Sequence, residues 1–250
     1  MTNAPFDLTG RTALVTGAGK GIGRAVALAL AVAGADVVLH ARTGTDLDDV
    51  EKEIRAAGRS VRRWLLDLSE PARIPAAVAE VGPVDILVNN AGTIRRGPTV
   101  EQSYDTWREV LDVNLDAVFL LTRALGAGML DRGHGKVITI ASLLSFQGGL
   151  NVAAYTASKH AVAGLTKALA NEWTARNVQV NAIAPGYIST ANTRALRADP
   201  QREPSIRDRI PAGRWGRPED VAGAAVFLAS PAADYVAGHV LVVDGGWLAR

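Results

Sequence analysis

Apolar and polar positions divide the chain into short hydrophobic runs that alternate with longer helical patterns. The hydrophobic runs lie at 12–16, 35–41, 60–68, 84–92, 135–142, 178–185 and 239–246, and the helical patterns lie at 21–34, 45–58, 70–82, 103–130, 152–176 and 218–229. Because the hydrophobic runs are nearly continuous, they are typical of parallel strands covered on both faces. The pattern therefore predicts an α/β fold, a doubly wound parallel sheet with helices on both faces.

These elements follow one another without a break that would separate domains. No linker rich in Pro, Gly or Ser and no internal repeat interrupts them, so a single domain over 1–250 is the simplest interpretation. A chain of 250 residues is long enough to bury a sizeable core. Its 48% hydrophobic and 21% charged residues are typical of a soluble globular protein.

Charge and cysteine content exclude several classes of function. The net charge of +2, without a long Lys/Arg run, does not favour nucleic acid as a partner. The absence of cysteine excludes disulfides, thiolate catalysis and cysteine-ligated metals, and His40, His134, His160 and His239 lack metal-binding spacing. We find no signal-peptide pattern at the start and no apolar run long enough to span a membrane. We therefore expect a cytoplasmic protein without metal, membrane or nucleic-acid partners.

Glycines cluster where the first predicted strand meets the first predicted helix, in TGAGKGIG (16–23). Gly17, Gly21 and Gly23 give the spacing G-x-x-x-G-x-G, which differs from the G-x-G-x-x-G dinucleotide fingerprint. Such glycines allow a tight turn and close backbone approach, and the helix N-terminus offers N–H groups to a pyrophosphate. The loop therefore predicts a dinucleotide site. A turn that only packs the helix on the strand is the alternative.

The end of the second predicted strand indicates which dinucleotide would bind. An acidic residue there contacts the ribose hydroxyls of NAD, whereas an arginine accommodates the 2′-phosphate of NADP. Here Arg42 occupies this end, no carboxylate follows until Asp46, and Lys20 adds a second cation from the glycine loop. The pattern favours NADP(H) over NAD(H), unless both cations are ordinary exposed residues. Asp67, after the third strand, is placed to bind the adenine amino group or, alternatively, to cap a helix with Ser69.

Six stretches together resemble the short-chain dehydrogenase/reductase family. They are TGAGKGIG (16–23), NNAG (89–92), DVNL (112–115), IAS (140–142), YTASK (155–159) and APG (184–186), and they occur in the family's order over nearly the whole chain. The resemblance implies a single NAD(P)-binding Rossmann-like domain with about seven strands, usually in a homotetramer or homodimer. It also implies an NAD(P)-dependent oxidoreductase that acts on CH–OH groups.

The candidate catalytic residues centre on a tyrosine and a lysine four positions apart. On a helix, Tyr155 and Lys159 would share one face, and a nearby ammonium would lower the pKa of the phenol. A solvated helical face is the alternative. The resemblance implies a catalytic tetrad of Asn114, Ser142, Tyr155 and Lys159. In it Ser142 and Tyr155 bind the carbonyl oxygen, Tyr155 transfers the proton, Lys159 binds the nicotinamide ribose and Asn114 holds a water.

The glycine loop, the strand ends and the family resemblance together predict the residues that would bind the cofactor. They are Gly17, Lys20, Gly21, Ile22, Gly23, Arg42, Asp67, Leu68, Asn89, Ala91, Gly92, Tyr155, Lys159, Pro185, Gly186, Ile188 and Thr190. Some of these have simpler alternatives, since Asn89 could form a turn and Pro185–Gly186 could merely end a strand.

The segment 187–214 lies where the family carries a mobile substrate lid. Its last 24 residues hold six arginines against Asp199, Glu203 and Asp208, which suits an anionic substrate because arginine binds carboxylates in a bidentate manner. A solvated amphipathic helix is the alternative interpretation of this composition.

A closer resemblance connects the chain with the sugar-acid branch of the family. The stretches that carry it are IRR (94–96), SFQGG (145–149), NAIAPGY (181–187), NTRALRAD (192–199), RIPAGRWG (209–216) and VDGGWLAR (243–250). They are similar to gluconate 5-dehydrogenases, 2-deoxy-D-gluconate 3-dehydrogenases and 2-dehydro-3-deoxy-D-gluconate 5-dehydrogenases. The resemblance implies a hydroxy or keto sugar acid bound by Arg95, Ser142, Gln147, Tyr155, Asn192 and Arg197. A broad-specificity carbonyl reductase and a 3-oxoacyl-[acyl-carrier-protein] reductase are alternatives. A non-catalytic NADP-binding sensor is a more remote one.

Overall fold

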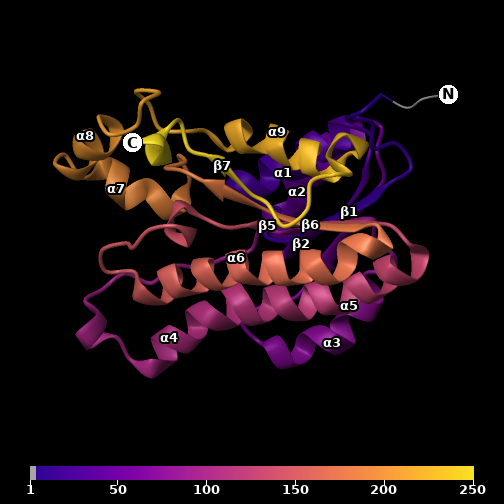
Figure 1. Ribbon diagram of the computed structural model, residues 1–250, viewed down its shortest axis with the longest axis horizontal. Helices are drawn as coiled ribbons and strands as arrows, with labels where there is room; N and C mark the ends of the chain where they lie inside the picture. The colour runs from indigo at the N-terminus through magenta and orange to yellow at the C-terminus, as the bar shows by residue number, and fades with distance from the viewer. Residues whose placement is uncertain (1–3) are drawn as a thin grey trace.

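Seven parallel strands form one continuous sheet at the centre of the molecule (Figure 1). The computed structural model describes residues 4–250, so residues 1–3 of the expected single domain lie outside the described residues. The strands are β1 (Thr12–Val15), β2 (Asp36–Ala41), β3 (Val61–Leu65), β4 (Ile86–Asn89), β5 (Gly135–Ile140), β6 (Val178–Pro185) and β7 (Val240–Val243). Their order, β3-β2-β1-β4-β5-β6-β7, reverses between β1 and β4, where open α/β sheets bind ligands at the carboxyl ends of the strands.

Helices cover both faces of this sheet. They are α1 (Gly21–Val32), α2 (Asp48–Ala56), α3 (Ile74–Ala77), α4 (Tyr104–Leu111), α5 (Ala117–Arg132), α6 (Ala153–Trp173), α7 (Arg194–Ala198), α8 (Arg202–Arg207) and α9 (Pro218–Ala229). Figure 1 shows α1, α2 and α9 on one face and α3 to α6 on the other, with α7 and α8 beside the C-terminus. The predicted doubly wound fold is confirmed.

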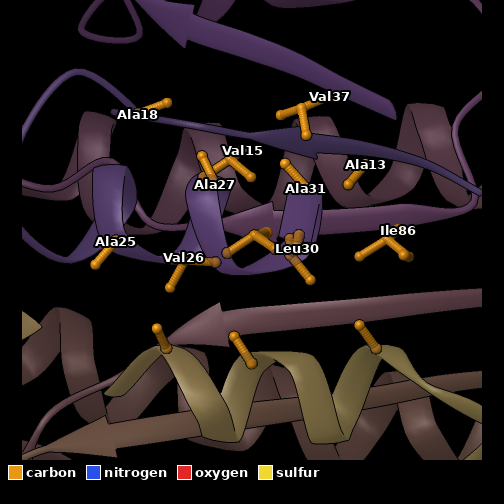
Figure 2. Close-up of a cluster of buried hydrophobic side chains, with 14 of the residues drawn as sticks. Ala13, Val15, Ala18, Ala25, Val26, Ala27, Leu30, Ala31, Val37 and Ile86 are labelled. Atoms are coloured by element: carbon orange, nitrogen blue, oxygen red, sulfur yellow. The ribbon is translucent and has the colours of Figure 1, made fainter. Parts of the chain in front are cut away.

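Small side chains let α1 pack closely between the sheet and α9. Figure 2 shows Ala27, Leu30 and Ala31 of α1 near Val15 and Val37 of the neighbouring strands, and all five are almost completely buried. Close packing fixes the direction of α1, so its N-terminus opens at the carboxyl end of β1. Truncation of Leu30 to Ala should cost about 2–5 kcal/mol, as for other buried leucines.

The predicted helix at 70–82 is mostly irregular. Only Ile74–Ala77 is α-helical, and 3-10 turns occupy Pro71–Arg73 and Val78–Glu80. The difference has a local cause, because Pro75 lacks the N–H group that would bond to the main-chain oxygen of residue 71 in a continuous helix.

The predicted helix at 103–130 is continuous but not regular. Between α4 and α5 the backbone widens into a π turn at Asp112–Asp116. The whole stretch Tyr104–Arg132 has a mean hydropathy of 1.4 in its most apolar window and, by length and composition alone, could cross a membrane. Asp116 and Arg123 interrupt the apolar run within this stretch, so the uninterrupted runs stay short, as expected from the sequence. Leu121 and Met129 of α5 are buried in the core against the sheet, as in core helices of soluble proteins.

Candidate active site

Helix α6 brings two of the predicted catalytic residues to the carboxyl end of β5. Lys159 is only 5% exposed, and its Nζ donates a hydrogen bond to the main-chain oxygen of Ile140 at 2.7 Å. The same Nζ lies 5.5 Å from the centre of the Tyr155 ring, which is half-buried. Because Ile140 is the last residue of β5, this bond anchors the Tyr155–Lys159 face of α6 at the edge of the sheet where ligands bind.

Ser142 joins this pair from the loop that follows β5. Its Oγ accepts a hydrogen bond from Leu144 N at 3.1 Å and so caps the 3-10 turn Leu143–Ser145. The turn is tied to α6 by Ser145, whose Oγ donates to the main-chain oxygen of Lys159 at 2.6 Å. The Ser142 side chain also forms a hydrogen bond with the phenol of Tyr155. The structure therefore brings Ser142, Tyr155 and Lys159 together.

Burial controls the ionisation of Tyr155 and Lys159 in the chain alone. It raises the pKa of Tyr155, against smaller lowering effects of the Ser142 side chain and the positive charge of Arg96. It also lowers the pKa of Lys159 to about 8. The sequence predicted that Lys159 lowers the pKa of Tyr155, and for the chain alone this was wrong: the ammonium is directed to Ile140, and the charge that acts on the phenol is Arg96.

Asn114 lies in the π turn and is completely buried. Its Oδ1 accepts from Thr93 N at 2.8 Å, and its Nδ2 donates to Thr93 O at 2.9 Å and to Ser158 Oγ at 3.2 Å. Ser158 Oγ in turn donates to the main-chain oxygen of Tyr155 at 2.7 Å. Asn114 is thus connected to the catalytic helix through one hydroxyl. Its predicted role in holding a water stays a prediction.

A single arginine bridges both ends of the π turn. The guanidinium of Arg108 contacts the carboxylates of Asp112 and Asp116, the latter at 2.6 Å. These carboxylates are the first and last residues of the turn that carries Asn114. The ion pairs therefore hold the widened turn that directs Asn114 toward Thr93.

The glycine loop has the shape expected of a pyrophosphate cradle. Gly17 has a φ of 64°, and a Cβ there would lie 3.1 Å from the Cα of Ala91. A Cβ on Gly23 would overlap Gly17 O and the side chain of Asn90. The first turn of α1 contains no acidic residue and its N-cap, Lys20, makes no side-chain capping bond, so the N–H groups of this helix end suit an anion.

Two cations lie near this loop where an adenosine phosphate would be recognised. Lys20 and Arg42 are exposed, and neither forms an ion pair within residues 4–250. Although burial would raise the pKa of Asp67, hydrogen bonds from Ser69 and the charge of Arg42 lower it. Arg42 therefore lies close to the predicted adenine residue. The side chain of Asp67 also accepts from Ser69 N at 2.9 Å, so the capping alternative describes its present contacts.

The nicotinamide side of the predicted site starts at the end of β6. Gly186 N donates to Val243 O at 2.9 Å, and Ile188 is 5% exposed beside Gly216. Farther along, Thr190 packs against Gly21, so the segment after β6 returns to the glycine loop.

Two of the predicted cofactor residues have buried side chains, and their contact with a cofactor stays a prediction. Leu68 is 4% exposed and packs in the core, and Asn89 is 2% exposed. The Asn89 side chain donates to Thr122 Oγ1 of α5 at 2.9 Å, which directs it away from the surface.

Comparison with known proteins identifies the family. A family model described as enoyl-(acyl carrier protein) reductase matches residues 17–248. The 2-dehydro-3-deoxy-D-gluconate 5-dehydrogenase of Bacillus subtilis is 56% identical over 98% of this chain and 97% of its own. The gluconate 5-dehydrogenase of Gluconobacter oxydans is 42% identical over 96% of each chain. The chain belongs to the short-chain dehydrogenase/reductase family.

Solved structures agree with this assignment. A gluconate 5-dehydrogenase from Burkholderia cenocepacia, in complex with NADP and tartrate, is 42% identical with a TM-score of 0.94 over 98% of each chain. A provisionally assigned 2-deoxy-D-gluconate 3-dehydrogenase from Agrobacterium tumefaciens with bound NADP is 57% identical with a TM-score of 0.95, covering 99% of this chain and 100% of its own. The family resemblance and the Rossmann-like fold that the sequence predicted are confirmed. The prediction that the chain is an oxidoreductase of this family is confirmed as well.

Of the predicted substrate residues of this short-chain dehydrogenase/reductase, Ser142 and Tyr155 lie together, and the other four come from separate segments of the chain. Arg95 forms an ion pair with Glu109 and donates to Thr93 Oγ1 at 2.9 Å, so its guanidinium is already engaged. Arg197 lies in an open hollow of about 380 Å³ between α7 and α8. Asn192 is exposed on the preceding 3-10 turn, and Gln147 is half-buried in the loop after β5.

Arg96 is the functional candidate that the sequence prediction missed. It is exposed, and within residues 4–250 it has no ion-pair partner, yet its charge acts on the phenol of Tyr155. The sequence signal was present in IRR (94–96), but adjacent arginines cannot be told apart until Glu109 is known to take Arg95.

Metal-binding groups do not gather in the described part of the chain. Among residues 4–250, no three His, Asp or Glu side chains come together in a way that could hold a metal ion.

Proposed function

We propose that the protein is an NADP(H)-dependent oxidoreductase that interconverts the secondary alcohol and ketone of a hydroxy or keto sugar acid, as a gluconate 5-dehydrogenase does. The observation that supports an anionic substrate is the unpaired guanidinium of Arg96, whose positive charge acts to lower the pKa of the Tyr155 phenol. The names of the relatives that are 42% and 56% identical support the sugar acid.

The chain's own residues supply acid–base chemistry at the reacting oxygen. NADP(H), when bound, supplies or accepts the hydride. In reduction the Tyr155 hydroxyl donates a hydrogen bond and then its proton to the carbonyl oxygen, and Ser142 donates a second hydrogen bond there. In oxidation the Tyr155 phenolate accepts the alcohol proton. Lys159 binds the nicotinamide ribose, and Asn114, which is fixed by its two hydrogen bonds to Thr93, holds a water that links Lys159 to solvent.

Arg96 would bind the substrate carboxylate near this centre. A guanidinium can hold a carboxylate through two parallel hydrogen bonds, and Arg96 has all its donors free of side-chain partners within the described residues. Arg95 would act indirectly, because its bond to Glu109 fixes the segment that carries Arg96. Ser142 and Tyr155 would bind the reacting end, while Gln147, Asn192 and Arg197 would meet the hydroxyls if the lid closes over them.

NADP(H) is the preferred cofactor in this proposal, and NAD(H) is the weaker one. The unpaired Lys20 and Arg42 beside the glycine loop support recognition of a 2′-phosphate. Residues of the loop and strand ends, from Gly17 to Thr190, would hold the dinucleotide. The bound NADP in related structures supports the same preference.

We further propose a cytoplasmic homotetramer, with a homodimer as the smaller alternative. Helix α5 leaves Phe119 42% exposed, and the Arg123 guanidinium lies 6.0 Å from its ring centre. A second copy of the chain packed along α5 would cover the Phe119 ring. Within each copy, residues 1–250 would act as one NAD(P)-binding domain with a substrate lid at 187–214. Light scattering on a size-exclusion column measures the assembly.

A 3-oxoacyl-[acyl-carrier-protein] reductase is the second candidate. A protein of that name from Agrobacterium tumefaciens with NADP bound is 33% identical over 98% of this chain and 97% of its own, with a TM-score of 0.89. The arginine-rich lid would also suit an acidic carrier.

Initial rates of nicotinamide oxidation test these proposals. The purified chain would be supplied with NADPH or NADH and with one of four carbonyl substrates. These are 5-ketogluconate, the 5-keto compound formed by oxidation of 2-dehydro-3-deoxygluconate, a neutral ketone and an acetoacetyl thioester. We expect the highest kcat/KM with NADPH and a keto sugar acid. Turnover confined to the thioester or to the neutral ketone would refute the sugar-acid proposal and favour one of its rivals.

A further inference from the structure

One buried titratable side chain has no part in the chemistry described above. His40, near the end of β2, is 2% exposed, and burial lowers its pKa to about 4. A buried imidazole needs a hydrogen-bond partner at each nitrogen, and His40 has both. Its Nδ1 lies 3.2 Å from Gly17 N, and its Nε2 lies 3.0 Å from Leu66 O.

These two partners determine the tautomer of His40. An amide N–H can only donate, so Nδ1 must be the acceptor for Gly17. A carbonyl oxygen can only accept, so Nε2 must carry the proton and donate it to Leu66. The ring is therefore neutral with hydrogen on Nε2, and protonation at Nδ1 would break the bond to the glycine loop.

The bond from Gly17 is part of a wider clamp on the first peptides of the glycine loop. The next amide, Ala18 N, donates to the main-chain oxygen of His40 at 2.9 Å. On the other side, Asn90 Nδ2 donates to Thr16 O at 2.8 Å and to Gly17 O at 3.2 Å. The peptide groups on both sides of Gly17 are thus fixed, and with them the direction of the N–H groups that follow in the loop.

The other end of His40 is attached to the strand end that carries the predicted adenine residue. Leu66 directly precedes Asp67, and Leu66 N donates to Ala41 O at 3.2 Å. The imidazole consequently joins the pyrophosphate loop to the adenine edge of the site through one rigid ring.

We propose that His40 is a positioning residue for the dinucleotide, which sets the glycine loop and the end of β3 at the separation that the two halves of the cofactor require. The inference rests on the dinucleotide site of the proposed function and is independent of its substrate. Loss of His40 should weaken cofactor binding and leave hydride transfer in the bound complex nearly unchanged, since no catalytic residue contacts it.

Two substitutions separate the two hydrogen bonds. His40→Asn keeps a side-chain amide atom near the position of Nδ1, so the bond from Gly17 N can form, but the side chain is too short to bond to Leu66 O. His40→Gln places a donor near the position of Nε2 and loses the acceptor for Gly17. The control is Trp64→Phe, because Trp64 packs on the His40 ring at 5.1 Å between centroids and its Nε1 has no partner to lose.

Calorimetric titration with NADPH, followed by kcat at saturating NADPH, gives the test. We expect His40→Gln to raise the Kd about tenfold and His40→Asn about threefold, the effects of one lost hydrogen bond at a more and a less direct position. Trp64→Phe should leave the Kd within about twofold even where it lowers Tm as much as the His40 variants do. All variants should keep kcat within about twofold of wild type.

Three outcomes would overturn the inference. They are an unchanged Kd for His40→Gln, an equal rise for Trp64→Phe, and a fall in kcat that saturating NADPH does not restore. Wild-type protein that binds NADPH but reduces no sugar acid would refute the proposed substrate alone, because the titration needs no substrate. Wild-type protein that binds no NADPH would overturn both.

Discussion

The ammonium of Lys159 lies 5.5 Å from the centre of the Tyr155 ring and donates to the end of β5 rather than to the phenol. Both groups are shifted by burial toward their neutral forms. Tyr155 is therefore protonated in the chain alone, as a proton donor in carbonyl reduction should be. Its use as a base in oxidation needs additional positive charge nearby, which Arg96 already provides in part.

Replacement of Tyr155 by Phe should abolish most turnover and keep cofactor binding. The substitution removes one hydroxyl and retains the ring, so kcat should fall by about 10³-fold, within the range of general acid–base catalysis. Stopped-time assays of NADPH oxidation measure the loss. Tyr104→Phe is the matched control, because Tyr104 is 72% exposed at the start of α4. Equal activity in the two variants would contradict the assignment of Tyr155.

Arg96→Ala should weaken the reaction with sugar acids more than Arg95→Ala does. A lost hydrogen-bonded contact to a carboxylate is worth about 2–3 kcal/mol, so kcat/KM should fall by about 30-fold to 150-fold. Because the charge of Arg96 lowers the pKa of Tyr155, its removal should also move the alkaline rise of the oxidation rate to higher pH. Comparable losses with a neutral ketone would show that Arg96 does not bind the carboxylate.

Substitution of Lys20 and Arg42 by Ala should change the choice of cofactor. Each loses one contact to a 2′-phosphate, so the KM for NADPH should rise about tenfold per site while the KM for NADH stays nearly constant. Steady-state kinetics with both cofactors measures the ratio. Lys52→Ala, an exposed lysine on α2, should leave it unchanged. A uniform loss with both cofactors would argue against phosphate recognition.

Arg108→Gln should loosen the π turn and lower kcat severalfold. The side chain loses its contacts with Asp112 and Asp116, which brace the turn that carries Asn114. Urea unfolding should show a loss of about 1 kcal/mol, the upper end for partly exposed pairs. Arg55→Gln breaks an exposed pair with Glu51 on α2 and should leave kcat at the wild-type value. If both variants kept full kcat, the ion pairs would have no role in positioning Asn114.

Acid should destabilise the protein through His40. Burial lowers its pKa from 6.5 to about 4, so between these values the unfolded chain binds a proton that the native chain does not. The contribution is complete above pH 6.5 and is lost as the pH falls toward 4, about 3 kcal/mol in total. The free energy of unfolding in urea, measured from pH 7 to 4.5, should fall less steeply for His40→Asn. The exposed His160→Asn variant should retain the wild-type slope.

Local patterns in the sequence determined most of the fold and much of the site. Strand runs, the glycine loop and the Tyr155–Lys159 spacing are readable because each depends on neighbours within a few positions. The irregular helix at 70–82 was foreseeable from Pro75, although the apolar pattern alone favoured a continuous helix. The choice between Arg95 and Arg96 was not, since it depends on Glu109 from another element.

Contacts between distant segments account for the remaining differences. The π turn follows from the fit of Asn114 between Thr93 and Ser158, which lie 21 and 44 positions away. The ionisation of Tyr155 depends on how deeply α6 is buried. Neither the position of the π turn nor the ionisation of Tyr155 follows from a periodic pattern in the sequence.

The π turn at Asp112–Asp116 also affects how the polypeptide length of this helix relates to its geometry. A π turn closes i→i+5 hydrogen bonds, so it accommodates one residue more than the α-helical turn that it replaces. Deletion of a single residue there would let α4 and α5 run as one straight helix, with better backbone hydrogen bonds, and would rotate Asn114 out of its pocket. The extra residue thus exchanges some backbone hydrogen bonding for the placement of Asn114 beside Thr93 and Ser158.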